Sequence, residues 1–311
     1  MKRTEGINHR YRGLDIWPDG DVLEALWEGQ RRAVDCLRPA LPAIAAAARA
    51  MAERLGRQGR LIFAGAGSAG RLAGIEAMEL GPTFGFPDAR TALLMAGGET
   101  LSPGSHGGVE DDGADGERRM AALRPVPDDV VIAVAASGST AFTLAAVRRA
   151  RAAGALTIGI ANNPETPLLE ESDHPILLDS GAEVINGSTR MGAGTAEKAA
   201  LNLLTTLAMI RLGHVYDGLM VGLRVENAKL RDRAIAMLVE ITGCPPEAAA
   251  ETLAGSADSV KTAALRLKGA RPEEADRLLD KAGGNLRIAL GSLAADGGAP
   301  GSHDPKQGVE P

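Results

Sequence analysis

The sequence predicts an α/β fold, in which a parallel sheet is flanked by helices and followed by a small helical C-terminal module. Short apolar runs alternate with helical patterns between residues 60 and 212, which is typical of βαβ units. Two of the apolar runs end in glycine-rich turns that lead into helical patterns. Near the C-terminus, Pro246-Glu247-Ala248 is matched by Pro272-Glu273-Glu274, a weak repeat with a period of 26 residues that indicates paired helices.

The first 55 residues precede the alternating region. Residues 1–20 are polar and predict an arm rather than a core element. Residues 21–55 have a helical pattern, which we expect to break near Pro39 and Pro42 because proline removes a backbone donor.

The alternating region then supplies the sheet and its helices. We predict strands at residues 60–64, 91–96, 130–136, 155–160 and 174–178. Helices are predicted at residues 68–80, 140–153, 193–212 and 223–242. The segment 97–116 is rich in glycine and is predicted to be a loop with room for one short helix.

These elements suggest four parts of the chain. They are an arm at 1–20, an α/β domain at 21–242, a helical module at 243–295 and a disordered tail at 296–311.

Composition narrows the class of function. The chain has 311 residues and a net charge of −6, without a basic stripe interleaved with aromatics, so nucleic acid is not an expected partner. No apolar run reaches the length of a membrane span, and no apolar segment follows Met1-Lys2-Arg3, so we expect neither a membrane partner nor a secretory signal. The two cysteines, Cys36 and Cys244, fit a reducing compartment, and we expect a cytoplasmic protein without a metal site.

The two glycine-rich turns have the form of an anion site. Gly65-Ala66-Gly67-Ser68-Ala69-Gly70-Arg71 follows one apolar run, and Ser137-Gly138-Ser139-Thr140 follows another. Free N–H groups and hydroxyls at helix starts bind phosphate, although Ser139 could equally be a helix cap. The first turn also matches a dinucleotide fingerprint, but the next predicted strand ends in Gly97-Gly98 rather than in an acid, which disfavours hydride transfer. No Gly-Lys-Ser/Thr is present, which disfavours a kinase.

Two glutamates are candidates for proton transfer. Glu79 lies among Ala77, Met78 and Leu80, so we expect it to be partly desolvated and able to hold a proton. Glu76 lies three residues earlier on the same helix face. Glu110 belongs to the glycine-rich loop and is expected to ionise more easily than Glu79.

At these residues the chain resembles the N-acetylmuramic acid 6-phosphate etherase family of sugar isomerase (SIS) domain proteins. The resemblance spans nearly the whole length, and its motifs occur in the family's order. They include Thr4-Glu5-Gly6-Ile7-Asn8, Gly81-Pro82-Thr83-Phe84-Gly85, Val109-Glu110-Asp111-Asp112, Gly181-Ala182-Glu183-Val184, Gly187-Ser188-Thr189-Arg190-Met191 and Asn227-Ala228-Lys229-Leu230-Arg231.

The resemblance implies cleavage of a D-lactyl ether by elimination and hydration, in peptidoglycan recycling or amino sugar catabolism, by a homodimer that needs no cofactor. Residues 21–242 would then be a SIS-type phosphosugar-binding catalytic domain, with Glu79 and Glu110 as its catalytic residues. The substrate and its phosphate would be held by Gly67, Ser68, Arg71, Ser137, Gly138, Ser139, Thr140, Glu183, Ser188 and Thr189. Two other functions remain open for such a chain, a phosphosugar-binding regulator and an aldose–ketose phosphosugar isomerase, and release of D-lactate distinguishes them from the etherase.

Overall fold

A five-stranded parallel sheet forms the centre of the first part of the chain. In the computed structural model, which describes residues 2–56, 58–98 and 108–297, the strand order is β2-β1-β3-β4-β5. The strands are β1 (Leu61–Gly65), β2 (Thr91–Met95), β3 (Val130–Val134), β4 (Leu156–Ala161) and β5 (His174–Leu177). The predicted fold class is therefore confirmed, and each strand lies within two residues of its predicted range.

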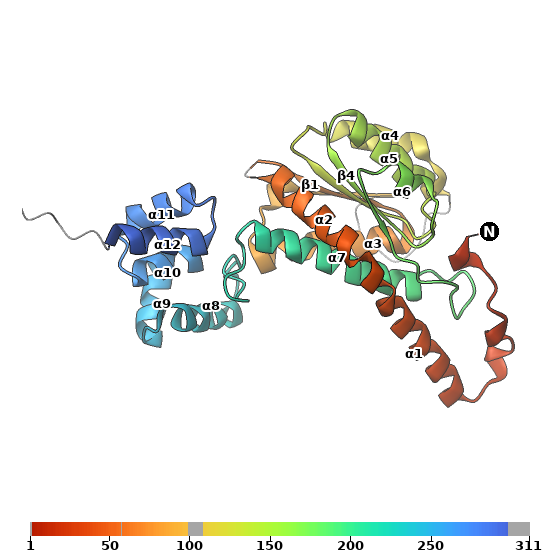
Figure 1. Ribbon diagram of the computed structural model, residues 1–311, viewed down its shortest axis with the longest axis horizontal. Coiled ribbons are helices and arrows are strands. Elements are labelled where there is room, and N and C mark those ends of the chain that lie inside the picture. Colours follow the sequence, from red (N-terminus) through yellow and green to blue (C-terminus); the bar gives the residue numbers. More distant parts are fainter. Residues whose placement is uncertain (1, 57, 99–107, 298–311) are drawn as a thin grey trace, which may run out of the picture. The chain divides into compact units, whose positions relative to one another are not determined.

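Helices cover both faces of this sheet, as Figure 1 shows. One face packs against α4 (Gly113–Ala122), α5 (Ala141–Ala152) and α6 (Pro167–Glu171), and the other against α2 (Leu37–Leu55) and α3 (Gly67–Phe84), on which α7 (Gly192–Arg211) packs in turn. Alternate strand residues such as Ile62, Ala64 and Val131 join Phe142 of α5 in one buried cluster. Burial on both faces explains why the strands are continuous apolar runs.

The N-terminal helical region divides at a different residue from the one predicted. Helix α1 spans Asp19–Asp35 and α2 begins at Leu37, so the break lies at Cys36 and not near Pro39 or Pro42. Pro39 falls in the first turn of α2, where no intrahelical partner is needed for its missing N–H, and the helix continues through Pro42.

The arm before α1 packs onto its own chain. It forms three short 3₁₀ turns, Arg3–Glu5, His9–Tyr11 and Leu14–Ile16. Thr4 is completely buried, and Tyr11 is buried in a small cluster with Ala25 and Val184. Two side chains of a segment that the sequence predicted to be an arm rather than a core element are therefore buried in a core.

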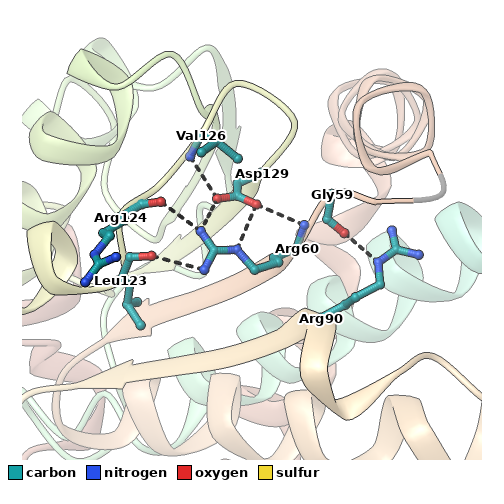
Figure 2. A network of polar contacts seen from close by, with 7 residues as sticks. All are labelled: Gly59, Arg60, Arg90, Leu123, Arg124, Val126 and Asp129. Carbon is teal, nitrogen blue, oxygen red and sulfur yellow. Dashed lines mark hydrogen bonds and ion pairs between the residues drawn. The ribbon is translucent and has the colours of Figure 1, made fainter.

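A polar network fixes the ends of β1 and β3 that lie opposite the glycine-rich turns (Figure 2). The Arg60 guanidinium contacts the Asp129 carboxylate at 2.6 Å and donates to the carbonyl of Leu123 at 3.0 Å. Asp129 also accepts from the backbone N–H of Val126 at 2.9 Å. These contacts join the strand starts, because β1 and β3 pair in register from Leu61 and Val130 onward.

The second part of the chain has its own helical core. The division lies between Leu212 and Gly213, whereas the sequence placed it after residue 242. The helices are α8 (Ala228–Thr242), α9 (Pro246–Ala254), α10 (Val260–Leu267), α11 (Pro272–Lys281) and α12 (Leu286–Gly297). Helix α8 belongs with them because Met237 and Leu238 are buried in the same cluster as Leu253 and Leu265.

The predicted repeat corresponds to two helix pairs, α9–α10 and α11–α12. Pro246 and Pro272 each begin a helix, and Ala263 and Ala289 are both completely buried. Of the predicted tail at 296–311, residues 298–311 lie outside the described residues, as do residues 99–107 of the predicted loop.

Candidate active site

The two glycine-rich turns lie side by side at the carboxyl ends of neighbouring strands. Gly65 at the end of β1 pairs with Val134 at the end of β3. Helix α3 begins two residues after β1, and α5 begins after Thr140. The N-termini of both helices therefore meet at one edge of the sheet, where their N–H groups and dipoles favour an anion.

Tight backbone packing holds these turns in place. A Cβ on Gly65 would lie 2.8 Å from the Cα of Gly70, so helix α3 approaches the strand more closely than another residue would allow. Gly138 has a φ of +65°, and a Cβ there would lie 2.2 Å from Oγ1 of Thr166. Both positions require glycine, and both shape the cavity described next.

A polar cavity of about 390 Å³ opens between the turns, a volume suited to a small ligand. It is lined by Lys2, Thr4, Glu5, Ala66, Gly67, Ser68, Ala69, Glu110, Asp111, Ala135, Ala136, Ser137, Ser139, Thr140, Gly187, Thr189 and Glu197. We call this cavity the polar pocket. Seven of the predicted site residues, Gly67, Ser68, Glu110, Ser137, Ser139, Thr140 and Thr189, line it.

The hydroxyls of the second turn form a connected cluster. Ser137 Oγ lies 3.3 Å from Thr140 Oγ1 and accepts from the backbone N–H of Ser139 at 3.2 Å. The Lys2 ammonium donates to Ser139 Oγ, which brings a positive charge from the arm to the same place. No side-chain cap bond is formed by Thr140 at the start of α5, so its hydroxyl is not used as a helix cap.

The arm reaches the pocket through Thr4. Its backbone N–H donates to Asn163 Oδ1 at 3.2 Å, and its hydroxyl accepts from Asn163 Nδ2 at 2.9 Å. Asn163 is the second residue after β4, so the arm is anchored at the edge of the sheet where the turns meet. Lys2 was not predicted to line the pocket, although the Thr4-Glu5-Gly6 motif beside it gave a signal.

Glu110 and Glu79 occupy different environments. Glu110 lines the polar pocket, and a Cβ on Gly67 would lie 3.6 Å from its Oε2. The Glu79 side chain is 61% exposed and its Oε2 lies 3.8 Å from Nζ of Lys198, so the expectation that its apolar neighbours desolvate it was wrong. Glu79 lies about 18 Å along α3 from Gly67, at 1.5 Å per residue, so it and Glu110 do not meet within one chain.

The buried glutamate of that helix face is Glu76. Its carboxylate accepts from Nδ2 of Asn202 at 2.6 Å and from the hydroxyl of Thr205 at 2.5 Å. The Lys198 ammonium donates to it at 3.2 Å. All three donors belong to α7, so Glu76 joins α3 to α7 and does not line the pocket.

Four further predicted site residues lie outside the pocket lining. Glu183 is buried and accepts from the N–H groups of Gly192 and Ala193, both at 2.9 Å, which satisfies the start of α7. Ser188 lies in the turn before α7, and Arg71 is exposed on α3. Gly138 shapes the second turn through its backbone rather than by lining the cavity.

Glu197 is a pocket residue that the sequence analysis missed. It lies on α7, its side chain is almost completely buried, and its Oε1 has no hydrogen-bond partner among the described residues. Burial, and next the charge of Glu183, raise its pKa to about 8. The sequence held one signal for it. Glu197 lies four residues after Ala193 and four before Leu201, both buried, so its carboxyl group lies on the apolar face of a helix.

No group of three or more His, Cys, Asp or Glu in the described ranges is arranged to hold a metal ion. Within the same ranges, no helix combines the length and apolar character needed to cross a bilayer.

Comparison with known proteins agrees with this geometry. The SIS domain model matches residues 109–207. The N-acetylmuramic acid 6-phosphate etherase of Deinococcus radiodurans is 47% identical, with 95% of this chain and 97% of that protein covered. The etherase of the same name from Rubrobacter xylanophilus is 43% identical over 89% of this chain and 92% of its own length.

Solved structures share the fold. A putative phosphosugar isomerase involved in capsule formation from Bacteroides fragilis superposes with a TM-score of 0.51, covering 65% of this chain and 95% of its own, at 22% identity. At that identity the likeness concerns the sheet and its helices only.

Proposed function

The chain belongs to the N-acetylmuramic acid 6-phosphate etherase family, and we propose from this membership that it cleaves the D-lactyl ether of N-acetylmuramic acid 6-phosphate. The products are N-acetylglucosamine 6-phosphate and D-lactate, and the enzyme is a carbon–oxygen lyase. The observation that carries the proposal is the polar pocket, which combines two helix N-termini, a hydroxyl cluster and a carboxylate.

The phosphate of the substrate binds between the two turns. Ser68, Ser137, Ser139 and Thr140 supply hydroxyls there, and the helix starts supply N–H groups. Lys2 adds a charge-assisted donor, which is stronger than a neutral one. Thr189 and the backbone at Gly187 contact the sugar from the loop before α7.

The reaction requires a base and an acid. In the open-chain aldehyde, a base takes the proton from carbon 2, the C–H electron pair forms the C2=C3 bond, and the C3–O bond breaks. An acid gives the ether oxygen its proton, which releases lactate, and water then adds across C2=C3. Glu110, the carboxylate beside Gly67, acts at carbon 2 or on the incoming water.

The acid is Glu79, by the resemblance of its segment to the family motif. Because Glu79 is exposed and far from the pocket of its own chain, it acts in the pocket of a second copy, and the functional unit is a homodimer. The free Cys36 and Cys244 support a reducing, cytoplasmic site of action for this dimer.

The first test measures D-lactate released by the purified protein from N-acetylmuramic acid 6-phosphate. The expected result is turnover of the phosphorylated sugar only, and loss of about two to four orders of magnitude in Glu110→Gln. A protein that binds the sugar phosphate without releasing lactate is a regulator. One that converts it to a ketose is an isomerase. Either result overturns the proposal.

The second test mixes two inactive variants. Glu79→Gln and Glu110→Gln are unfolded and refolded together, so that mixed dimers form. If Glu79 acts on the partner's pocket, each mixed dimer holds one intact pair of acids, and about a quarter of the wild-type rate returns for random pairing of symmetric subunits. If no activity returns although mixed dimers have formed, Glu79 does not act across a dimer.

A further inference from the structure

Glu197 lies in the wall of the polar pocket and has no role in the reaction as proposed. Its side chain is 1% exposed, yet its Oε1 accepts no hydrogen bond from any residue that the structure describes. Buried polar groups in folded proteins are nearly always hydrogen-bonded, so an unpaired one in a ligand cavity indicates a partner supplied by the ligand.

The surroundings of Glu197 oppose a negative charge. Charged residues on the elements around it include Lys2 and Glu5 of the arm, Glu110 and Asp111 of the turn before α4, Glu183 and Arg190 before α7, Arg32 of α1, Arg71 and Glu76 of α3, and Lys198 of α7. Of the described residues that line the pocket, Lys2 is the one cation, and it is hydrogen-bonded to Ser139. Arg32 donates to the carbonyl of Ala182 and Lys198 to Glu76, so neither is directed to Glu197.

Glu183 and Glu197 differ in the hydrogen-bond donors that reach their carboxyl groups. Glu183 accepts from two N–H groups at the start of α7, an arrangement that suits a carboxylate. Glu197 has no such donors at Oε1, and the nearby Glu183 charge repels a second one. Burial and this repulsion raise the pKa of Glu197 to about 8, so it carries a proton at neutral pH.

We propose that Glu197 binds the ligand as a neutral carboxylic acid, donating a hydrogen bond to an oxygen of the phosphorylated sugar. A neutral acid offers one O–H donor and one carbonyl acceptor, as the amide of glutamine offers a donor and an acceptor. It makes this contact without adding a further negative charge next to an anionic ligand. This role rests on the proposed function for the identity of the sugar, but it concerns binding rather than proton transfer.

The proposal predicts a specific pH dependence. A sugar phosphate is fully dianionic above about pH 7.5, since its second pKa is about 6. Above that pH the charge of the sugar phosphate no longer changes, so a loss of its affinity reflects a change in the protein. Ionisation of Glu197 removes the donor and adds repulsion, so the affinity of the wild-type protein should fall by about tenfold for each pH unit above 8.

The experiment measures binding of N-acetylglucosamine 6-phosphate and of inorganic phosphate by calorimetry from pH 7.5 to 9.5. Glu197→Gln should bind at pH 7.5 within about threefold of the wild-type protein and show no fall in affinity at higher pH. Glu197→Ala should bind about tenfold more weakly than Glu197→Gln at every pH, because it lacks the donor. Glu117→Gln, on the exposed surface of α4, is the control for charge removal and should keep the wild-type pH profile.

A wild-type profile that is flat to pH 9.5, or a Glu197→Gln profile that falls like the wild type, overturns the proposal. Difference infrared spectroscopy of the wild-type protein tests it without any variant, since the carbonyl band of a protonated carboxyl should disappear between pH 7 and pH 9. If the sugar phosphate binds with the expected profile but no D-lactate is released, the etherase proposal fails and the role of Glu197 stands.

Discussion

Replacing Glu76 should destabilise the first part of the chain far more than replacing Glu79, although both carboxylates contact the same lysine. The Glu76 side chain is 4% exposed, and its oxygens lie 3.2 Å from Lys198, 2.6 Å from Asn202 and 2.5 Å from Thr205. The Glu79 side chain is 61% exposed and lies 3.8 Å from Lys198. The two glutamates therefore differ in the burial of their side chains and in the number of donors that contact their carboxylates.

The magnitude follows from these contacts. Removing one partner of a buried ion pair costs about 3–5 kcal/mol. Here the Thr205 hydroxyl would stay buried without its acceptor, and Lys198, whose side chain is 33% exposed, would lose its counter-charge. We therefore expect Glu76→Ala to lower the free energy of unfolding by about 3–5 kcal/mol. Glu76→Gln keeps the shape but loses the charge, and should cost about 1–3 kcal/mol. Glu79→Gln removes an exposed pair and should cost less than about 1 kcal/mol.

The assay is urea unfolding followed by tryptophan fluorescence. Both tryptophans of the chain, Trp17 and Trp27, lie in the first part, so the signal reports on that part alone. For a domain of this size, 1 kcal/mol shifts the melting temperature by about 2–4 °C, so Glu76→Ala should melt about 6–20 °C lower. If Glu76→Ala and Glu79→Gln shift the urea midpoint equally, with equal slopes, the reasoning from burial is refuted.

Two further predictions concern Asp129 and Gly138. Burial alone would raise the pKa of Asp129, but the hydrogen bonds from Arg60 and Val126 outweigh it and lower the pKa below 3.8, so this carboxylate contributes stability that is present above pH 3.8 and lost as the pH falls below it. Urea unfolding should show this acid-dependent loss in the wild-type protein and a smaller one in Asp129→Asn, which is already less stable at pH 7. Gly138→Ala should cost about 1–3 kcal/mol of strain, since φ is +65° and the new Cβ would meet Thr166, and calorimetry should find phosphate affinity lowered at least tenfold. Unchanged phosphate affinity in that variant would mean that the second turn does not hold the anion.

The sequence predicted the elements of the sheet because each strand is a continuous apolar run that a short-range pattern reveals. The order β2-β1-β3-β4-β5 is set by contacts between distant residues, and the alternation of elements implied only that the sheet is parallel. The helix break lies at Cys36, and it was predicted too far along the chain, near Pro39 and Pro42, for a similar reason. A proline in the first turn of a helix is compatible with it, and the local sequence did not show where that turn begins.

The site residues that could be predicted are those that lie in a turn after a strand. Ser68, Ser137, Ser139 and Thr140 follow strands directly, and the structure gathers them around one cavity. Glu76 and Glu79 could not be told apart, because both lie on one helix face and only α7 decides which of them is buried. Lys2 and Glu197 were missed since each joins the pocket through tertiary packing.

The pocket walls come from widely separated stretches of the chain. Lys2 and Ser139 are in contact across 137 positions, and Glu197 closes the same cavity from α7. During synthesis the growing chain therefore completes both glycine-rich turns before the cavity has its last wall, which arrives only when α7 emerges and docks. Nascent chains that stop before α7 should carry a formed β-sheet edge and still fail to retain a sugar phosphate, so ligand capture marks the completion of this folding unit rather than an early step in it.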